Sequence, residues 1–187
     1  ERVDPEIIQL LKILNSDERI ITSSSCSGRI VILEALSPTH KPSADFISKW
    51  HRKPPRAEFL EITSSILRSC RQDGRNTFVW CSVQPPILDI HVCDPVLVIK
   101  LLDTLYKSGF KNACLKTLKN SYMIMVRGTT RCDIPLCVKG KTVIDASNLD
   151  SIYEIVLSYF DYAEKELNRL YILADFIKSL KNNTSFY

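Results

Sequence analysis

The chain has 187 residues, of which 45% are hydrophobic and 25% are charged, and its net charge is +4. These values are typical of one soluble globular domain whose core needs neither disulfides nor a structural metal. The sequence holds no run of 18 apolar residues, which excludes a predicted membrane span. The mild positive charge permits contact with a polyanion without demanding it. We therefore expect residues 1–187 to form a single domain.

The seven cysteines stand at irregular spacings, and no Cys-x-x-Cys pair occurs. Cys132 and Cys137 enclose four residues that include a proline, and no histidine lies near them in the sequence. We therefore expect no metal site. Free cysteines within apolar runs behave as small hydrophobic residues. A reducing cytoplasm is the simplest compartment for such a chain, and no secretory leader is visible.

The first third of the chain begins with a predicted helix. Asp4-Pro5-Glu6 places a capping carboxylate before a proline at the first helical position, and Asn15-Ser16-Asp17 ends the helix. Ile20–Thr22 and Ile30–Leu33 are predicted strands around a small polar turn. Residues 37–57 carry four prolines. They are predicted to form a long surface loop, with a short helix near residues 45–49, and loops of this length are usually functional or mobile.

The remaining elements alternate between helices and strands. Asp94-Pro95 repeats the cap-and-proline start, and Gly109 ends that helix. The predicted helices span 57–71, 94–108 and, from Asn148 or Asp150, a long stretch to about Leu180. The predicted strands span 77–83, 87–93, 113–118 and 122–127, with short ones at 134–138 and 142–144. The order predicts an α+β fold, a single domain with a mixed β-sheet flanked by helices.

The stretch Ser24-Ser25-Cys26-Ser27-Gly28-Arg29 is the densest polar cluster, and it stands directly before an apolar strand. Glycine lets a ligand approach the backbone, hydroxyls donate hydrogen bonds, and arginine offers a planar charged fork. These residue types suit an anionic or polar ligand. The alternative is a turn at the start of a strand, whose serines bond their own backbone.

A basic segment with one aromatic residue forms a second candidate. Lys49, Trp50, His51, Arg52 and Lys53 are consecutive. An aromatic side chain among basic ones suits RNA binding, because the ring can stack on a base while the cations contact phosphates. The alternative is a tryptophan packed on the core beside a solvated basic loop. His51 is also a candidate proton acceptor.

Several motifs in the same order resemble the wybutosine-synthesising tRNA methyltransferase family, in its archaeal-type members. The matching stretches are Thr22–Ile30, Trp50–Arg52, Phe78–Trp80 with Pro85–Leu88, Ser108–Asn112, and Val126–Thr130 with Ile134–Leu136. The resemblance spans roughly residues 4 to 137. No Gly-x-Gly-x-x-Gly follows a predicted strand, so a Rossmann-type methyltransferase is not expected.

The resemblance implies an S-adenosylmethionine-dependent methyltransferase of another fold. The implied substrate is the wyosine-type base next to the anticodon of phenylalanine tRNA, methylated at a ring nitrogen. Donor binding would fall to Ser24, Ser25, Cys26, Ser27, Gly28 and Arg29, and RNA contact to Lys49, Trp50, Arg52, Lys53, Asn112 and Arg127. Cys26 is expected to line the pocket rather than to act as a nucleophile.

Methyl transfer to nitrogen needs alignment and a proton acceptor. Asp89 falls where relatives often carry a histidine, on an otherwise apolar strand, and Gln84 replaces a frequent histidine or glutamate. Asp89 is therefore a candidate acceptor beside His51, or else a structural carboxylate, and it needs a partner or solvent. Two rival functions stay open: a non-catalytic tRNA-binding module, and a small-molecule-binding protein that shares only the fold.

Overall fold

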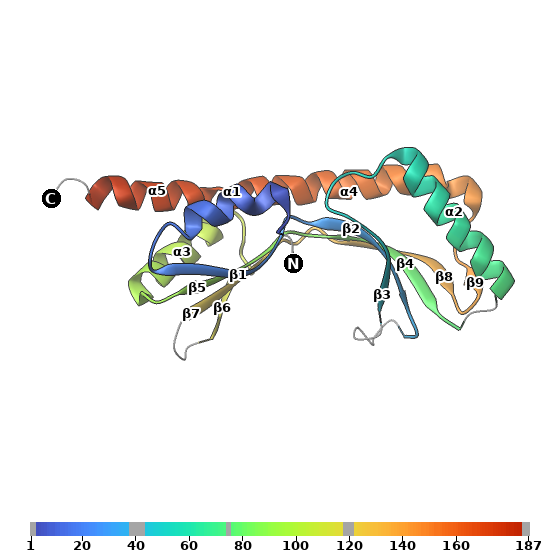
Figure 1. Ribbon diagram of the computed structural model, residues 1–187, viewed down its shortest axis with the longest axis horizontal. Helices are drawn as coiled ribbons and strands as arrows, with labels where there is room; N and C mark the ends of the chain where they lie inside the picture. Colours follow the sequence, from blue (N-terminus) through green and yellow to red (C-terminus); the bar gives the residue numbers. More distant parts are fainter. Residues whose placement is uncertain (1–2, 38–43, 74–75, 118–121, 185–187) are drawn as a thin grey trace. The chain divides into compact units, whose positions relative to one another are not determined.

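The structure of the chain is a computed structural model that describes residues 3–37, 44–73, 76–117 and 122–184. Its contacts divide the chain into two compact units. The first unit combines segments from 1–28, 85–129 and 163–187, and the second combines 29–84 and 130–162. Each unit therefore joins segments that are distant in the sequence, and each contains one β-sheet (Figure 1).

The first unit has a four-stranded sheet with the order β1-β5-β7-β6. The strands are β1 Ile20–Cys26, β5 Ile87–Val92, β7 Tyr122–Arg127 and β6 Cys114–Thr117, and all pairs are antiparallel. The helices α1 Pro5–Leu14, α3 Pro95–Lys107 and α5 Ile172–Thr184 pack on one face of this sheet (Figure 1).

The core of the first unit forms between that sheet face and the three helices. Alternate strand residues Leu88, Ile90 and Val92 are fully buried there, as expected for a sheet covered on one side. The helices contribute apolar residues at helical spacing: Ile7, Leu10, Leu14, Leu97, Leu101, Leu105, Leu173 and Ile177. The opposite face of the sheet carries the alternate set of side chains, among them Asp89 and His91.

The second unit has a five-stranded antiparallel sheet with the order β3-β2-β4-β8-β9. Its strands are β2 Arg29–Ala35, β3 Asp45–Trp50, β4 Phe78–Gln84, β8 Cys132–Val138 and β9 Lys141–Thr142. The helix α2 Arg56–Asp73 lies between β3 and β4 in the sequence, and the short 3-10 helix Ala146–Asn148 and α4 Leu149–Leu170 follow β9. The boundary between the units falls within α4, after Tyr162. An aromatic cluster of Trp50, Phe59 and Tyr153 joins β3, α2 and α4.

The predicted α+β class is confirmed, while the predicted mixed sheet is replaced by two antiparallel sheets. Strand partners are mostly distant in the sequence, such as β1 with β5, so their relative direction could not be derived from the pattern of single strands. Pro85 and Pro86 mark the passage from β4, in the second sheet, to β5, in the first.

Three predicted elements differ in the structure. The short helix expected near residues 45–49 is wrong, because this segment is the edge strand β3, paired with β2. Five residues are too few to offset the cost of helix nucleation, whereas pairing supplies ladder hydrogen bonds at once. The strand expected at 142–144 is instead the two-residue β9. The single C-terminal helix is interrupted at Tyr171, whose N–H bonds Asn168 O in a tighter turn.

Cys70 of α2 and Cys137 of β8 form a disulfide, which the cysteine spacings did not predict. The pairing depends on the packing of α2 against β8, and that contact is not visible in the sequence. The other five cysteines form no disulfide. Burial raises the pKa of the Cys81 thiol to about 12, so this thiol stays protonated and inert at neutral pH. Among the described residues, no helix is long and apolar enough to cross a membrane.

Candidate active site

The predicted serine cluster lies largely within β1, where it forms a β-bulge. Thr22 pairs with Ile90 and Ser25 pairs with Leu88, so that Ser23 and Ser24 together stand opposite Asp89. A bulge places two residues against one and redirects side chains, and bulges are frequent beside active sites. The sequence predicted a strand ending at Thr22, but the strand continues to Cys26 with this irregularity inside it. The register thus brings two exposed hydroxyls beside a carboxylate.

Asp89 is buried and ion-paired. Arg127 Nη1 donates to Asp89 Oδ1 at 2.6 Å and to its own Val126 O at 2.8 Å. Asp89 is only 5% exposed, so the guanidinium supplies the partner that a buried carboxylate requires. The residue predicted for proton transfer and the one predicted for RNA contact are therefore one charged pair.

A second polar pair lies on the same face of the first sheet. His91 Nε2 is 3.0 Å from Ser23 Oγ, and this contact fixes the hydroxyl at the bulge. His91 was not among the site residues predicted from the sequence. Its position two residues after Asp89, on the same side of β5, was the available signal. Met123 and Met125 pair with His91 and Asp89 on β7, so apolar side chains adjoin the polar pairs.

Ser27 and Gly28 have a structural role at the end of β1. The backbone N–H and Oγ of Ser27 donate to Asp4 Oδ2, at 2.9 and 3.3 Å. Asp4 thus occupies the predicted N-cap position of α1, but its carboxylate bonds Ser27 and not the helix N–H groups. Gly28 has a φ of 100°, which a residue with a side chain rarely adopts. The motif therefore needs its glycine for the backbone itself.

Arg29 belongs to the second unit, since the boundary falls between Gly28 and Arg29. Its Nε donates to Gln84 Oε1 at 2.6 Å, and its guanidinium lies 5.2 Å from the centre of the Phe46 ring. Because this hydrogen bond uses Nε, the two terminal nitrogens of the guanidinium keep the arrangement that suits a carboxylate or a phosphate.

The basic segment is divided between core and surface. Trp50 is 9% exposed, donates to Glu58 Oε1 at 2.8 Å and packs on Phe59, so the structure favours its core alternative over base stacking. His51 is half-buried and Arg52 is exposed. Lys53 is paired with Asp161 of α4. Lys49 Nζ lies 5.7 Å from the centre of the Phe46 ring.

The remaining predicted residue, Asn112, is exposed in the turn between α3 and β6. It lies in the first unit with the serines, Asp89 and Arg127, whereas Arg29 and the basic segment lie in the second. The described contacts therefore bring together Ser23, Ser24, His91, Asp89 and Arg127 as one polar group on a sheet face.

Comparison with known proteins assigns this fold to a class. The family described as Methyltransferase TYW3 matches residues 1–173. The chain is thus a methyltransferase of α+β architecture without a Rossmann fold. It belongs to the TYW3 methyltransferase family, which confirms the resemblance seen in the motifs.

Curated relatives from archaea support this assignment. A protein of Pyrococcus horikoshii named tRNA(Phe) 7-((3-amino-3-carboxypropyl)-4-demethylwyosine(37)-N(4))-methyltransferase 1 is 32% identical over 169 residues, which cover 90% of this chain and 82% of that protein. A second such methyltransferase, from Pyrococcus abyssi, is 33% identical and covers 91% of this chain and 79% of its own. The solved structure of the PH1069 protein from Pyrococcus horikoshii matches with a TM-score of 0.78 and 31% identity, covering 94% of this chain and 85% of that one.

Proposed function

We propose that this protein transfers a methyl group from S-adenosylmethionine to a ring nitrogen of the wyosine-type guanosine at position 37 of phenylalanine tRNA. The family match over residues 1–173 carries the proposal, together with the names of the archaeal relatives. An enzyme of tRNA maturation would work in the cytoplasm. The whole chain, 1–187, would act as one catalytic domain.

The polar face of the first sheet fits the methyl donor. The donor presents a carboxylate, an ammonium and a flat base, and supplies a methyl group already activated on a sulfonium. Ser24 offers a hydroxyl at the bulge opposite Asp89, and Arg127 offers a guanidinium on that face. Ser25 pairs with Leu88, so its side chain belongs to the other face of the strand, and it would contribute to the site through its backbone. Arg29 is a further candidate for the donor carboxylate or for a phosphate. Cys26 and Gly28 would line the site, and Ser27 would hold its backbone through Asp4.

The chain must also orient the nucleophile and accept a proton. We propose that Asp89, held in place by Arg127, accepts the proton that the ring nitrogen loses, and that His51 is the second candidate. His91 would position the Ser23 hydroxyl. Lys49, Arg52, Lys53 and Asn112 would contact the RNA backbone, where exposed cations and amides hold phosphates.

The test is methyl incorporation into phenylalanine tRNA that carries the demethylated base, followed by mass spectrometry of the nucleoside. Asp89→Asn should lower turnover by a factor on the order of 10²–10⁴, as general-base loss does. Asp103→Asn is the matched control, because Asp103 is an exposed carboxylate ion-paired with Lys107 on α3. Melting and donor titration of both variants separate lost chemistry from lost structure.

Three outcomes would contradict parts of this proposal. Full turnover in Asp89→Asn would make that carboxylate structural. Binding of tRNA by the unaltered protein without methyl incorporation would favour the non-catalytic tRNA-binding module. Donor binding without tRNA affinity would favour the small-molecule-binding alternative.

A further inference from the structure

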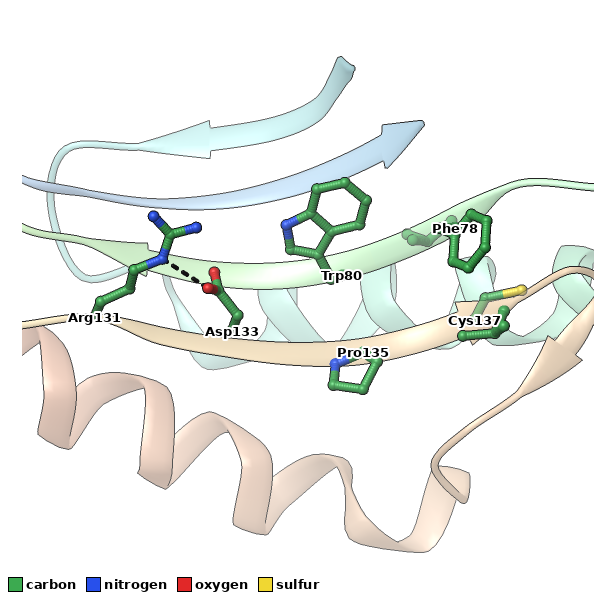
Figure 2. Close-up of a pocket in the computed structure, with 8 residues that line it drawn as sticks. Phe78, Trp80, Arg131, Asp133, Pro135 and Cys137 are labelled. Atoms are coloured by element: carbon green, nitrogen blue, oxygen red, sulfur yellow. Dashed lines mark hydrogen bonds and ion pairs between the residues drawn. The ribbon is translucent and has the colours of Figure 1, made fainter. Parts of the chain in front are cut away.

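The second sheet carries aromatic side chains on the face that its helices do not cover. Val79, Cys81 and Val83 of β4 are buried, so the alternate residues Phe78 and Trp80 point to the other side. Figure 2 shows the Trp80 ring standing out from β4, with Phe78 further along the same strand. We name this side the Trp80 face.

The cross-strand register places further residues on the Trp80 face. Leu33 pairs with Trp80 on one side and with Phe46 on the other, while Pro135 pairs with Trp80 from β8. Phe46, Leu33, Trp80 and Pro135 therefore form one row across four strands. Phe46 is 50% exposed on the edge strand. Neighbouring strands lie about 4.8 Å apart, so the two rings stand about 10 Å from each other.

Cations lie beside the aromatic residues of the Trp80 face. Lys49 and Arg29 lie over the Phe46 ring, at 5.7 and 5.2 Å from its centre, and Lys139 Nζ lies 5.9 Å from the centre of the Phe78 ring. Arg131 Nε donates to Asp133 Oδ2 at 2.7 Å beside Trp80 (Figure 2). The Asp133 carboxylate also accepts a hydrogen bond from Ser82, so its charge is compensated within the face. Lys49, Arg29 and Lys139 give the face an excess of positive charge.

A cavity of about 260 Å³ opens between these side chains, lined by Trp80, Phe78, Arg131, Asp133 and Pro135 among others. Clefts that enclose drug-sized ligands measure roughly 300–1,000 Å³. This cavity is therefore suited to one flat ring system rather than to a whole cofactor.

We propose that the Trp80 face binds an unpaired nucleotide of the RNA substrate, with its base stacked on Trp80 and its phosphates near Lys139 and Arg131. Aromatic residues accessible on an open sheet, flanked by cations, form the usual platform for single-stranded RNA, and Phe78 and Trp80 are half-buried on such a face. Trp50, the aromatic residue of the basic segment, is packed in the core, so the stacking role belongs to Trp80. This inference rests on the proposed action on tRNA.

The test uses an unmodified anticodon-loop oligonucleotide as the probe and tryptophan fluorescence as the readout. The chain has two tryptophans, and Trp50 is buried. The oligonucleotide should quench the unaltered protein and should quench Trp80→Phe much less. Trp80→Ala should weaken RNA affinity by about 5- to 150-fold, the range measured for loss of one stacked base. Trp80→Phe should retain most of the affinity, because it keeps an aromatic face.

The matched control is Tyr106→Ala. Tyr106 is 58% exposed on α3 and lies under Lys111, so it is an aromatic–cation pair on a different surface. Its loss should leave RNA affinity unchanged. In addition, Lys139→Gln should lower the slope of log affinity against log salt by about one.

Equal RNA affinity in Trp80→Ala and Tyr106→Ala would overturn the inference. Quenching of the tryptophan fluorescence by S-adenosylmethionine but not by RNA would overturn it as well. These results are distinct from a failure of the proposed function. Methyl transfer with an unchanged KM for tRNA in Trp80→Ala would refute the stacking and keep the enzyme. Quenching by RNA in a protein that transfers no methyl group would support the stacking and refute the enzyme.

Discussion

Gly128→Ala should strongly destabilise the first unit, although it adds only one methyl group. A Cβ at this position would overlap Glu166 Oε2 and lie 2.7 Å from Pro85 Cβ and 3.0 Å from Glu166 Cδ. Glu166 is 3% exposed, and its Oε1 accepts hydrogen bonds from the N–H and Oγ1 of Thr129, at 2.8 and 2.9 Å. Gly128→Ala must therefore displace either this carboxylate or the backbone.

Displacing either the carboxylate or the backbone costs stability. Overpacking a well-packed site costs about 1–3 kcal/mol, and loss of a hydrogen bond to a charged group costs about 1.5–3 kcal/mol. We expect Gly128→Ala to lower the free energy of unfolding by about 3 kcal/mol. In a chain of this length that corresponds to a fall of roughly 6–12 °C in melting temperature.

The assay is thermal and urea unfolding of four proteins: the unaltered chain, Gly128→Ala, Glu166→Ala and the double variant. Once Glu166 is shortened, the added methyl group no longer meets the carboxylate and still meets Pro85, so Gly128→Ala should cost clearly less in that background. Contacting residues commonly couple by about 0.5–3 kcal/mol. Additive costs within about 0.5 kcal/mol, or a Gly128→Ala variant as stable as the parent, would refute the steric reasoning.

Two further predictions concern the disulfide and a helix cap. The Cys70–Cys137 bridge closes a loop with a sequence separation of 67 residues, so its loss in Cys70→Ser should cost about 4 kcal/mol of stability. Thiol titration of the unfolded, unreduced protein should count the five cysteines outside the bridge, and a count of seven would contradict the bridge. Asp94 caps α3, and the N–H of Leu97 foremost, with that of Val96 and with Arg19, lowers the pKa of its carboxyl. The stability that the ionised Asp94 contributes should be complete above the ordinary Asp pKa of about 3.9 and should disappear as pH falls through the lowered pKa. The free energy of unfolding of the parent should therefore fall more steeply in acid than that of Asp94→Asn. Parallel pH curves for the two proteins would contradict this.

The sequence predicted those parts of the fold that depend on local chemistry. The capping residue and proline before α3 set its start, and the apolar alternation gave the strands of both sheets. Strand pairing across long sequence distances could not be predicted from the sequence. Asp45–Trp50 is a strand only because β2 offers an edge, and the interruption at Tyr171 has no proline or glycine to mark it.

The candidate site was predictable in composition but not in arrangement. The serine cluster and Asp89 were singled out from residue type and position, but the bulge that sets Ser23 and Ser24 against Asp89 depends on the register with β5. Arg127 and Asp89 were both named without being paired, since they are 38 residues apart. Trp50 was predicted to contact RNA, but it is buried, whereas Trp80, which was not predicted as a site residue, is partly exposed. The prediction of a single domain stays a prediction.

The discontinuous composition of the first unit has a consequence for how the chain is made. Its strand β1 is complete at Cys26, but α5, which supplies Leu173 and Ile177 to the same core, begins only at Ile172. At about 5–20 residues per second, a ribosome needs roughly 7–30 s to synthesise the intervening stretch. During that time the apolar side of β1 has no completed partner layer. The second unit ends at Tyr162, so all its segments are synthesised before α5 begins, while the first unit still lacks one of its three helices.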